Sequence, residues 1–233
     1  MKRLLTALGF ATTLSVAWLA CHAESTTESA PLERQAPLRG VPEAIALFKG
    51  IPQHGVELGN PDAETTLVEL SDLQCPFCRR FSADVLPTLV ERFIRPGKVR
   101  LVLRTLTFLG EDSKRAARVA QAAGRQNKLW QFTAIFFENQ GKENSGYATD
   151  DFLLKIASAI PGLDTDKAMR EQRSEPVSAE LAGAEAVAKK FSIHSVPAFL
   201  VGKTSGASLR ELKAPAGDAE RFAADLEEAI RRG

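Results

Sequence analysis

Apolar residues follow two different spacings along this chain, and the spacing separates strands from helices. Residues 65–71 form a nearly unbroken run of strand-forming side chains, as in a strand that is buried on both faces. From 77 to about 94 the apolar side chains recur at every fourth position, which predicts a helix, and the interior Pro87 predicts a kink in it. A second strand is expected at 99–105, which gives the strand–helix–strand order of a βαβ unit with a parallel pair.

A long helical block follows the second strand. Between 113 and 191 the strand signal almost disappears, and periodic segments predict helices at 113–125, 129–139, 149–160, 164–173 and 177–191. The second of these segments carries a dense band of aromatic side chains around Trp130 and Phe136. We interpret this band as the core of the block rather than as a cofactor site.

Strand character returns at 197–202, with a hairpin partner expected at 208–213 and a closing amphipathic helix at 218–232. Ahead of the βαβ unit, 42–49 predicts a short helix with proline in its first turn, and 54–58 predicts a short strand. The full order is β-β-α-β, a helical block, then β-β-α. This order predicts an α/β fold with a central sheet of about four strands and one long helical insertion.

The first 23 residues have the pattern of a signal peptide, with a basic start at Met1–Arg3 and an apolar or small run over 4–20. Cleavage after Ala23 is one interpretation. The other is a lipoprotein box at Leu19–Cys21, in which Cys21 becomes a lipid anchor. Both interpretations predict export, and under both Cys21 is removed or capped.

Composition and cysteine count narrow the function. The 233 residues are 44% hydrophobic and 25% charged with a net charge of +1, which is ordinary for a globular protein with an ample core and gives no sign of nucleic-acid binding. After export only Cys75 and Cys78 remain. A secreted domain stapled by disulfides would carry more cysteines in a shorter chain, so this pair indicates chemistry rather than scaffolding.

The stretch Cys75-Pro76-Phe77-Cys78 lies between the first predicted strand and its helix. Unpaired N–H groups and the positive end of the dipole at a helix N-terminus favour the thiolate of Cys75 and lower its pKa. Cys78, one turn further, is expected to be more shielded and to resolve a mixed disulfide. Pro76 suits the first helical turn, and Phe77 adds an apolar face that contacts either a substrate chain or the rim of a groove.

Two other interpretations of the cysteine pair stay open at the level of residues. A zinc site needs four ligands, and His54 and His194 are the only histidines beyond the signal peptide, but the spacing fits no compact zinc module. A purely structural disulfide would close only a small ring and stabilise the fold little. Thiol–disulfide exchange is the interpretation that the residues favour.

The run from Leu70 to Cys78, followed about 120 residues later by Ser195-Val196-Pro197-Ala198-Phe199, resembles the DsbA-like branch of the thioredoxin superfamily. The resemblance covers about Pro52 to Gly233, and it includes the lead-in at Leu58–Pro61 and the helical insertion. It implies a thioredoxin fold, with a central mixed sheet of about four to five strands and an inserted all-helical domain.

On this resemblance we divide the chain into five parts. They are a signal peptide (1–23), a flexible tether with a short helix (24–52), the first half of the thioredoxin fold with the cysteine motif (53–110), the helical insertion (111–191) and the second half with the cis-proline (192–233).

The resemblance also implies the role of each site residue. Cys75 is the nucleophile, Cys78 is the resolving thiol, and the two form the redox-active Cys75–Cys78 disulfide. Pro197 is the cis-proline that faces this disulfide, and Val196 offers its backbone to substrate as an added strand. Pro76 and Phe77 tune the redox properties. Phe77 stands where the strongest oxidants of the family carry histidine, so the strength of this oxidant is left open.

The function expected from these features is an exported, monomeric thiol–disulfide oxidoreductase of the periplasm or cell envelope. It is expected to donate its disulfide to unfolded or reduced exported proteins, without a bound cofactor or metal and without nucleic acid. An unidentified membrane or soluble redox partner resets it. The alternatives are a periplasmic reductase or isomerase of protein disulfides, and a non-catalytic thioredoxin-fold binding or chaperone module.

Overall fold

The structure is a computed structural model that describes residues 37–205 and 208–232. Its described part contains a mixed six-stranded sheet with the strand order β1-β2-β4-β3-β5-β6. The strands are β1 (Gln53–His54), β2 (Glu57–Leu58), β3 (Thr65–Ser71), β4 (Val99–Thr105), β5 (Ala198–Lys203) and β6 (Arg210–Glu211). The signal peptide, the fate of Cys21 and the tether up to residue 36 lie outside the described residues.

The centre of the sheet is β3, with β4 parallel to it on one side and β5 antiparallel on the other. All seven of its residues are buried, which explains why its sequence is strand-forming without alternation. Both strands of the predicted βαβ unit are confirmed with the predicted bounds, and so is their parallel pairing.

The sheet has six strands rather than four to five because residues 54–58 do not form one strand. Gly55 has a φ of +59°, a left-handed conformation that glycine adopts at little cost. The chain turns back there, so β1 pairs antiparallel with β2, and β2 then pairs antiparallel with β4. A segment this short offers too few positions for the turn to show in the hydrophobic pattern.

The helical segment after the cysteine motif is not one regular helix. It runs through α2 (Pro76–Arg80), a π-helical turn η1 (Phe81–Val85), α3 (Leu86–Leu89) and a second π-helical turn η2 (Val90–Ile94). Pro87 has no N–H, and its ring displaces the carbonyl four residues earlier. Before Pro87 the hydrogen bonds therefore widen to the π pattern, as in the bond from Leu86 N to Phe81 O. The second π-helical turn, with the bond from Arg95 N to Val90 O, lies after Pro87 and is not explained by it.

The predicted helical block is present as α4 (Glu111–Gly124), α5 (Leu129–Glu138), α6 (Asp150–Ser158), α7 (Thr165–Glu171) and α8 (Glu175–Lys190). Within it, α4 packs against α5, α7 and α8. Trp130 and Phe136 are buried, and the Phe136 ring lies 5.8 Å from that of Phe152. The interpretation of the aromatic band as the core of the block is confirmed.

The short helix predicted within 24–52 is present as α1 (Val41–Phe48), and it packs against α5. Phe48 is buried with its ring 6.2 Å from that of Trp130, and Arg39 donates to the carbonyl of Glu138. From residue 37 onward this range is therefore part of the packed unit. Within the described residues, no helix has the length and apolarity that a membrane span requires.

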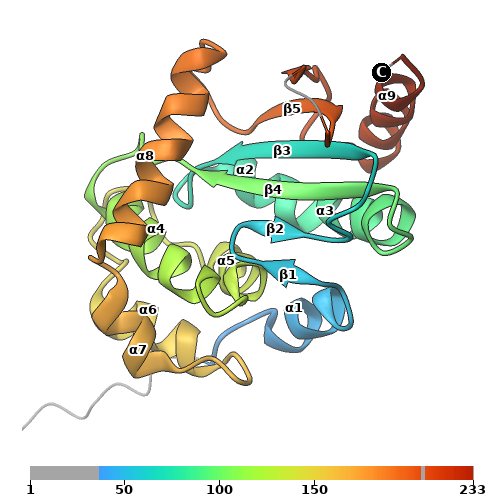
Figure 1. Ribbon diagram of the computed structural model, residues 1–233. Helices are drawn as coiled ribbons and strands as arrows, with labels where there is room; N and C mark the ends of the chain where they lie inside the picture. Colours follow the sequence, from blue (N-terminus) through green and yellow to red (C-terminus); the bar gives the residue numbers. More distant parts are fainter. Residues whose placement is uncertain (1–36, 206–207, 233) are drawn as a thin grey trace, which may run out of the picture. The chain divides into compact units, whose positions relative to one another are not determined.

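Helices cover both faces of the sheet (Figure 1). On one face Phe81 packs against Phe199 of β5 and Phe222 of α9 (Ala219–Arg232), with ring centroids 4.7 and 5.4 Å away. On the other face α8 packs on β4, with Ala184 buried in that contact layer. The carboxyl ends of the parallel strands β3 and β4 lie at one edge between these layers, and the cysteine motif follows β3 there.

Candidate active site

The cysteine motif begins at the N-terminus of α2. Cys75 occupies the N-cap position with φ −72° and ψ 121°, and Pro76 takes the first helical turn, where the missing N–H has no intrahelical partner to lose. Cys75 is 4% exposed and Cys78 is 0% exposed, whereas Phe77 is 61% exposed. The motif presents an aromatic ring to solvent and keeps both sulfurs largely covered.

The two thiols have opposite acidities. The pKa of Cys75 is lowered to about 6, first by a hydrogen bond from the Cys78 thiol and then by the backbone N–H groups of Cys78 and Phe77, while burial and the charge of Asp72 oppose the shift. Burial raises the pKa of Cys78 well above its ordinary range. At neutral pH, Cys75 is therefore mostly thiolate and Cys78 is thiol. Both are free thiols in the structure, so the Cys75–Cys78 disulfide stays a prediction.

Cys75 also meets the loop before β5, 121 residues further along the chain. In its protonated form the Cys75 Sγ donates to the carbonyl oxygen of Val196 at 3.4 Å, a contact that ionisation of the thiol removes. The Val196–Pro197 peptide bond is cis, as the resemblance implies. The two predicted cysteines and the predicted substrate-binding pair are thus brought together.

Glu69 is a candidate functional residue that the sequence reasoning missed. Its side chain is 3% exposed, and burial raises its pKa to about 8. Ser71, two residues further on the same face of β3, lowers the pKa of both Glu69 and Cys78. The Ser71 hydroxyl has no hydrogen bond of normal geometry among the described residues, so we assign it only a weak effect. The sequence signal that could have identified Glu69 is a charged residue inside a strand that is otherwise uncharged.

Asp72 is a second buried carboxyl beside the motif, with 0% exposure. It accepts hydrogen bonds from the backbone N–H groups of Gln74 at 2.9 Å and Leu109 at 3.0 Å, and from the Ser113 hydroxyl at 2.6 Å. These donors satisfy the charge and bind the end of β3 to the loop before α4. Because Asp72 opposes the lowered pKa of Cys75, it acts on the thiol as well as on the fold.

An apolar surface adjoins the motif. Phe108 is 46% exposed. Among the described residues, the other exposed large apolar side chains are those of Phe77 and Leu154. Its neighbour Leu109 bonds to Asp72 and Gln74, which places Phe108 in the loop next to the cysteine segment. Phe108 lies in an irregular loop, so no periodic pattern marked it.

The remaining residues singled out in the sequence lie apart from the sulfurs or in solvent. Arg79 and Arg80 are exposed, and Arg80 lies 3.9 Å from the exposed Asp84, as expected for a solvated basic pair. His194 is exposed and lines a shallow hollow with Pro197, while His54 is exposed on β1. Residues 37–205 and 208–232 contain no cluster of three or more His, Cys, Asp or Glu side chains that could hold a metal ion.

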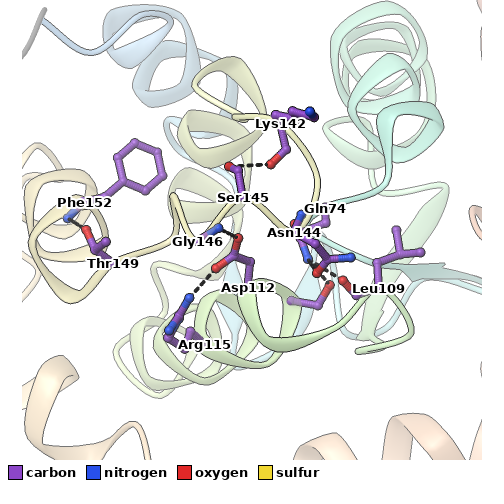
Figure 2. A network of polar contacts seen from close by, with 11 residues as sticks. Gln74, Leu109, Asp112, Arg115, Lys142, Asn144, Ser145, Gly146, Thr149 and Phe152 are labelled. Atoms are coloured by element: carbon purple, nitrogen blue, oxygen red, sulfur yellow. Dashed lines mark hydrogen bonds and ion pairs between the residues drawn. The ribbon is translucent and has the colours of Figure 1, made fainter.

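A polar network holds the segment before Cys75 (Figure 2). The Gln74 side chain lies beside Asn144 and Leu109, and its Nε2 donates to the Leu109 carbonyl at 2.5 Å. Asp112 accepts from the N–H of Gly146 at 2.8 Å and pairs with Arg115. These contacts connect the cysteine segment, α4 and the loop after α5.

Comparison with known proteins gives one consistent result. Residues 53–214 match the thioredoxin family. A probable disulfide bond formation protein D of Bacillus cereus is 31% identical over 147 residues, which cover 62% of this chain and 68% of that relative.

Solved structures agree with this match. A thioredoxin-like oxidoreductase from Silicibacter pomeroyi is 31% identical, covers 81% of this chain and 98% of its own, and has a TM-score of 0.60. Oxidised BdbD from Bacillus subtilis has a TM-score of 0.65 over 76% of this chain and 91% of its own. At 22% identity, BdbD supports the fold alone.

Proposed function

The chain belongs to the thioredoxin family as a DsbA-like thiol–disulfide oxidoreductase, and from this premise we propose that it oxidises cysteine pairs of exported proteins with a Cys75–Cys78 disulfide. The observation that carries the direction of transfer is the low pKa of Cys75, about 6. A stabilised thiolate stabilises the reduced protein, and this makes the corresponding disulfide the stronger oxidant.

The reaction takes place at Cys75, the less buried of the two cysteines. A substrate thiolate attacks the Cys75 sulfur, the Cys75–Cys78 bond breaks, and the electron pair leaves on Cys78. Because the pKa of Cys78 is high, Cys78 takes up a proton and becomes a poor competitor for the mixed disulfide. Glu69 is protonated below about pH 8 and lies on the same face of β3 as Ser71, which acts on both Glu69 and Cys78, so we expect Glu69 to be the proton source.

The second half of the reaction releases the product. A second substrate thiolate attacks the substrate sulfur of the mixed disulfide, and Cys75 leaves as a thiolate. A thiol with a low pKa leaves faster, which favours the oxidised substrate. The substrate thereby loses two electrons and two protons. Because Cys75 leaves as a thiolate, one proton passes to the solvent, and the protein gains the two electrons and one proton, on Cys78. A redox partner of membrane or soluble origin then removes them from the protein.

The substrate is expected to lie as an extended chain along Val196. The carbonyl of Val196 is 3.4 Å from the Cys75 sulfur, so a chain that pairs with this backbone brings its own cysteine to the thiol. The exposed Phe77 of the motif and Phe108 of the adjoining loop provide apolar contacts.

Location follows from the N-terminal pattern. Because residues 1–23 have the composition of a signal peptide, we place the protein in the periplasm or cell envelope, with Cys21 either removed or lipidated. We also propose that it acts as a monomer. In this proposal the two thioredoxin-fold halves, 53–110 and 192–233, enclose the insertion 111–191.

The test uses oxidised protein and an equimolar synthetic peptide with two cysteines. The peptide should be recovered as its disulfide and the protein as the dithiol. Given the peptide in its disulfide form, Cys78→Ser should accumulate a mixed disulfide through Cys75, whereas Cys75→Ser should accumulate none. Full peptide oxidation by Cys75→Ser would refute the assignment. Oxidised wild-type protein that binds the peptide and leaves its thiols reduced would favour a binding module.

A further inference from the structure

A side chain from the helical insertion holds the backbone on which Cys75 sits. Gln140, just after α5, donates from Nε2 to the carbonyl oxygens of Leu73 at 2.7 Å and of Cys75 at 3.2 Å. The two carbonyls flank Gln74, so one amide group fixes the segment on both sides of that residue. Gln140 is 65 residues away from Cys75 in the sequence.

The loop that carries Gln140 is itself fixed at two further points. Asn144 and Gln74 exchange hydrogen bonds, with the Asn144 N–H donating to Gln74 Oε1 at 2.7 Å and Gln74 Nε2 donating to Asn144 Oδ1 at 3.2 Å. Figure 2 shows these two side chains together, with Gly146 bonded to Asp112 of α4 nearby. Gln140 therefore projects from a braced loop, and its amide can hold a backbone in place.

The Cys75 carbonyl is a sensitive point to hold. It accepts the N–H of Arg79 at 3.1 Å, which is the first hydrogen bond of α2. The position of this carbonyl therefore sets the orientation of the first turn, and from this turn the N–H groups of Phe77 and Cys78 stabilise the Cys75 sulfur. Gln140 carries no charge and bonds to backbone oxygens, so it acts on the sulfur through the backbone.

We propose that Gln140 is a positioning residue that holds the first turn of α2 in the orientation in which its backbone N–H groups stabilise the Cys75 thiolate. The inference rests on the proposed role of Cys75 as the reacting thiol. It makes the helical insertion a working part of the redox site, through a residue well outside the cysteine motif.

Other groups face or surround the Cys75 sulfur and keep their identity when residue 140 is changed. They are the Cys78 thiol, the buried carboxyl of Asp72 and the Val196 carbonyl. The exposed Arg79, Arg80 and His194 and the buried Glu69 also keep their identity. A change caused by residue 140 alone is therefore measurable against a constant background.

The test compares Gln140→Met, which keeps the length but has no donor, with the matched control Gln126→Met. Gln126 makes a similar pair of bonds to the backbone of Asp164, at 3.0 and 2.9 Å, within the helical insertion. The Cys75 thiolate is titrated by its ultraviolet absorbance. The equilibrium of protein dithiol and glutathione disulfide with protein disulfide and two glutathione thiols is measured alongside.

Gln140→Met should lower the ratio of thiolate to thiol about three- to tenfold, the size of one net hydrogen bond, and should shift the glutathione equilibrium toward the protein disulfide. Gln126→Met should lower the melting temperature and leave both quantities unchanged. Gln140→Lys, which retains donors, should keep the thiolate ratio at or above the wild-type value, and it carries the test if Gln140→Met does not fold.

A Gln140→Met protein with a lower melting temperature and an unchanged thiolate ratio overturns the inference, and so does a reduced ratio in Gln140→Lys. Either result leaves the proposed function intact. Alkylation mapping of the wild-type protein separates the two claims, because labelling of Cys78 in place of Cys75 would refute the proposed function itself.

Discussion

Replacing the buried Glu69 by glutamine should change how the stability of the protein depends on pH. The carboxyl has a pKa of about 8 in the folded protein against an ordinary value of 4.5. The folded state therefore binds its proton more tightly than the unfolded state does. The stability that this provides is fully present below pH 4.5 and is lost as the pH rises through about 8.

The size of the effect follows from the shift. Relative to acid pH, the free energy of unfolding at pH 7 is lower by roughly 3 kcal/mol, because the unfolded carboxyl has ionised over about 2.5 pH units while the folded one keeps its proton. Above pH 8 the full gap of about 3.5 units is lost, which lowers the free energy of unfolding by roughly 5 kcal/mol, an upper limit because water reaches the group when the fold loosens. Glutamine resembles the protonated carboxyl in size and stays neutral, so Glu69→Gln should remove this pH dependence.

The assay is urea unfolding of the oxidised protein between pH 4.5 and 8.5, since oxidation removes both thiol titrations. Wild-type stability should fall across this range more steeply than that of Glu69→Gln, and the two curves should converge at the acid end. Glu185→Gln, on the exposed side of α8, serves as the control and should follow the wild type. Parallel curves for wild type and Glu69→Gln would show that Glu69 is ionised when buried and would refute the reasoning.

Three further predictions concern the surroundings of the motif. Asp72→Asn removes a charge that opposes the Cys75 thiolate, so the midpoint of the Cys75 titration should fall below about 6, and a rise in the midpoint would contradict the assigned sign. The same variant loses an acceptor for buried N–H groups, which should lower the free energy of unfolding in urea by about 1–3 kcal/mol. Phe108→Ser should raise the KM for a peptide substrate several-fold and leave the Cys75 titration unchanged, and an unchanged KM would remove Phe108 from the substrate surface. In the reduced wild type, the rate of alkylation by iodoacetamide should rise with a midpoint near pH 6 and label Cys75 before Cys78, and a midpoint near 9 would disprove the activated thiol.

Local sequence patterns were enough to predict the elements that position the cysteines. The bounds of β3 and β4 followed from continuous runs of strand-forming residues, and Cys75 was placed at a helix N-terminus because a strand ends just before it. The cis bond before Pro197 followed from the resemblance carried by the paired motifs. These features depend on residues that are close together in the sequence or recur in a family.

The rest of the site depends on contacts that the sequence does not encode locally. The pKa of Glu69 is raised to about 8 because side chains from other elements exclude water from it. The residues next to Glu69 in the sequence do not indicate how deeply it is buried. Gln140 bonds to the Cys75 carbonyl although the two residues are 65 positions apart in the sequence. The extra strand at Gly55 was missed because a turn of this kind needs a single glycine with positive φ and leaves no trace in a hydrophobic pattern.

The central claim, that this protein donates disulfides rather than reduces them, is tested most directly by the reduction potential of the Cys75–Cys78 pair. It is measured from the equilibrium of the protein with defined ratios of glutathione thiol to disulfide. The low pKa of Cys75 predicts a potential well above that of thioredoxin, in the range between about −180 and −120 mV that oxidising members of the superfamily occupy. A potential near the thioredoxin value of about −270 mV would contradict the account and assign the protein to the reductases.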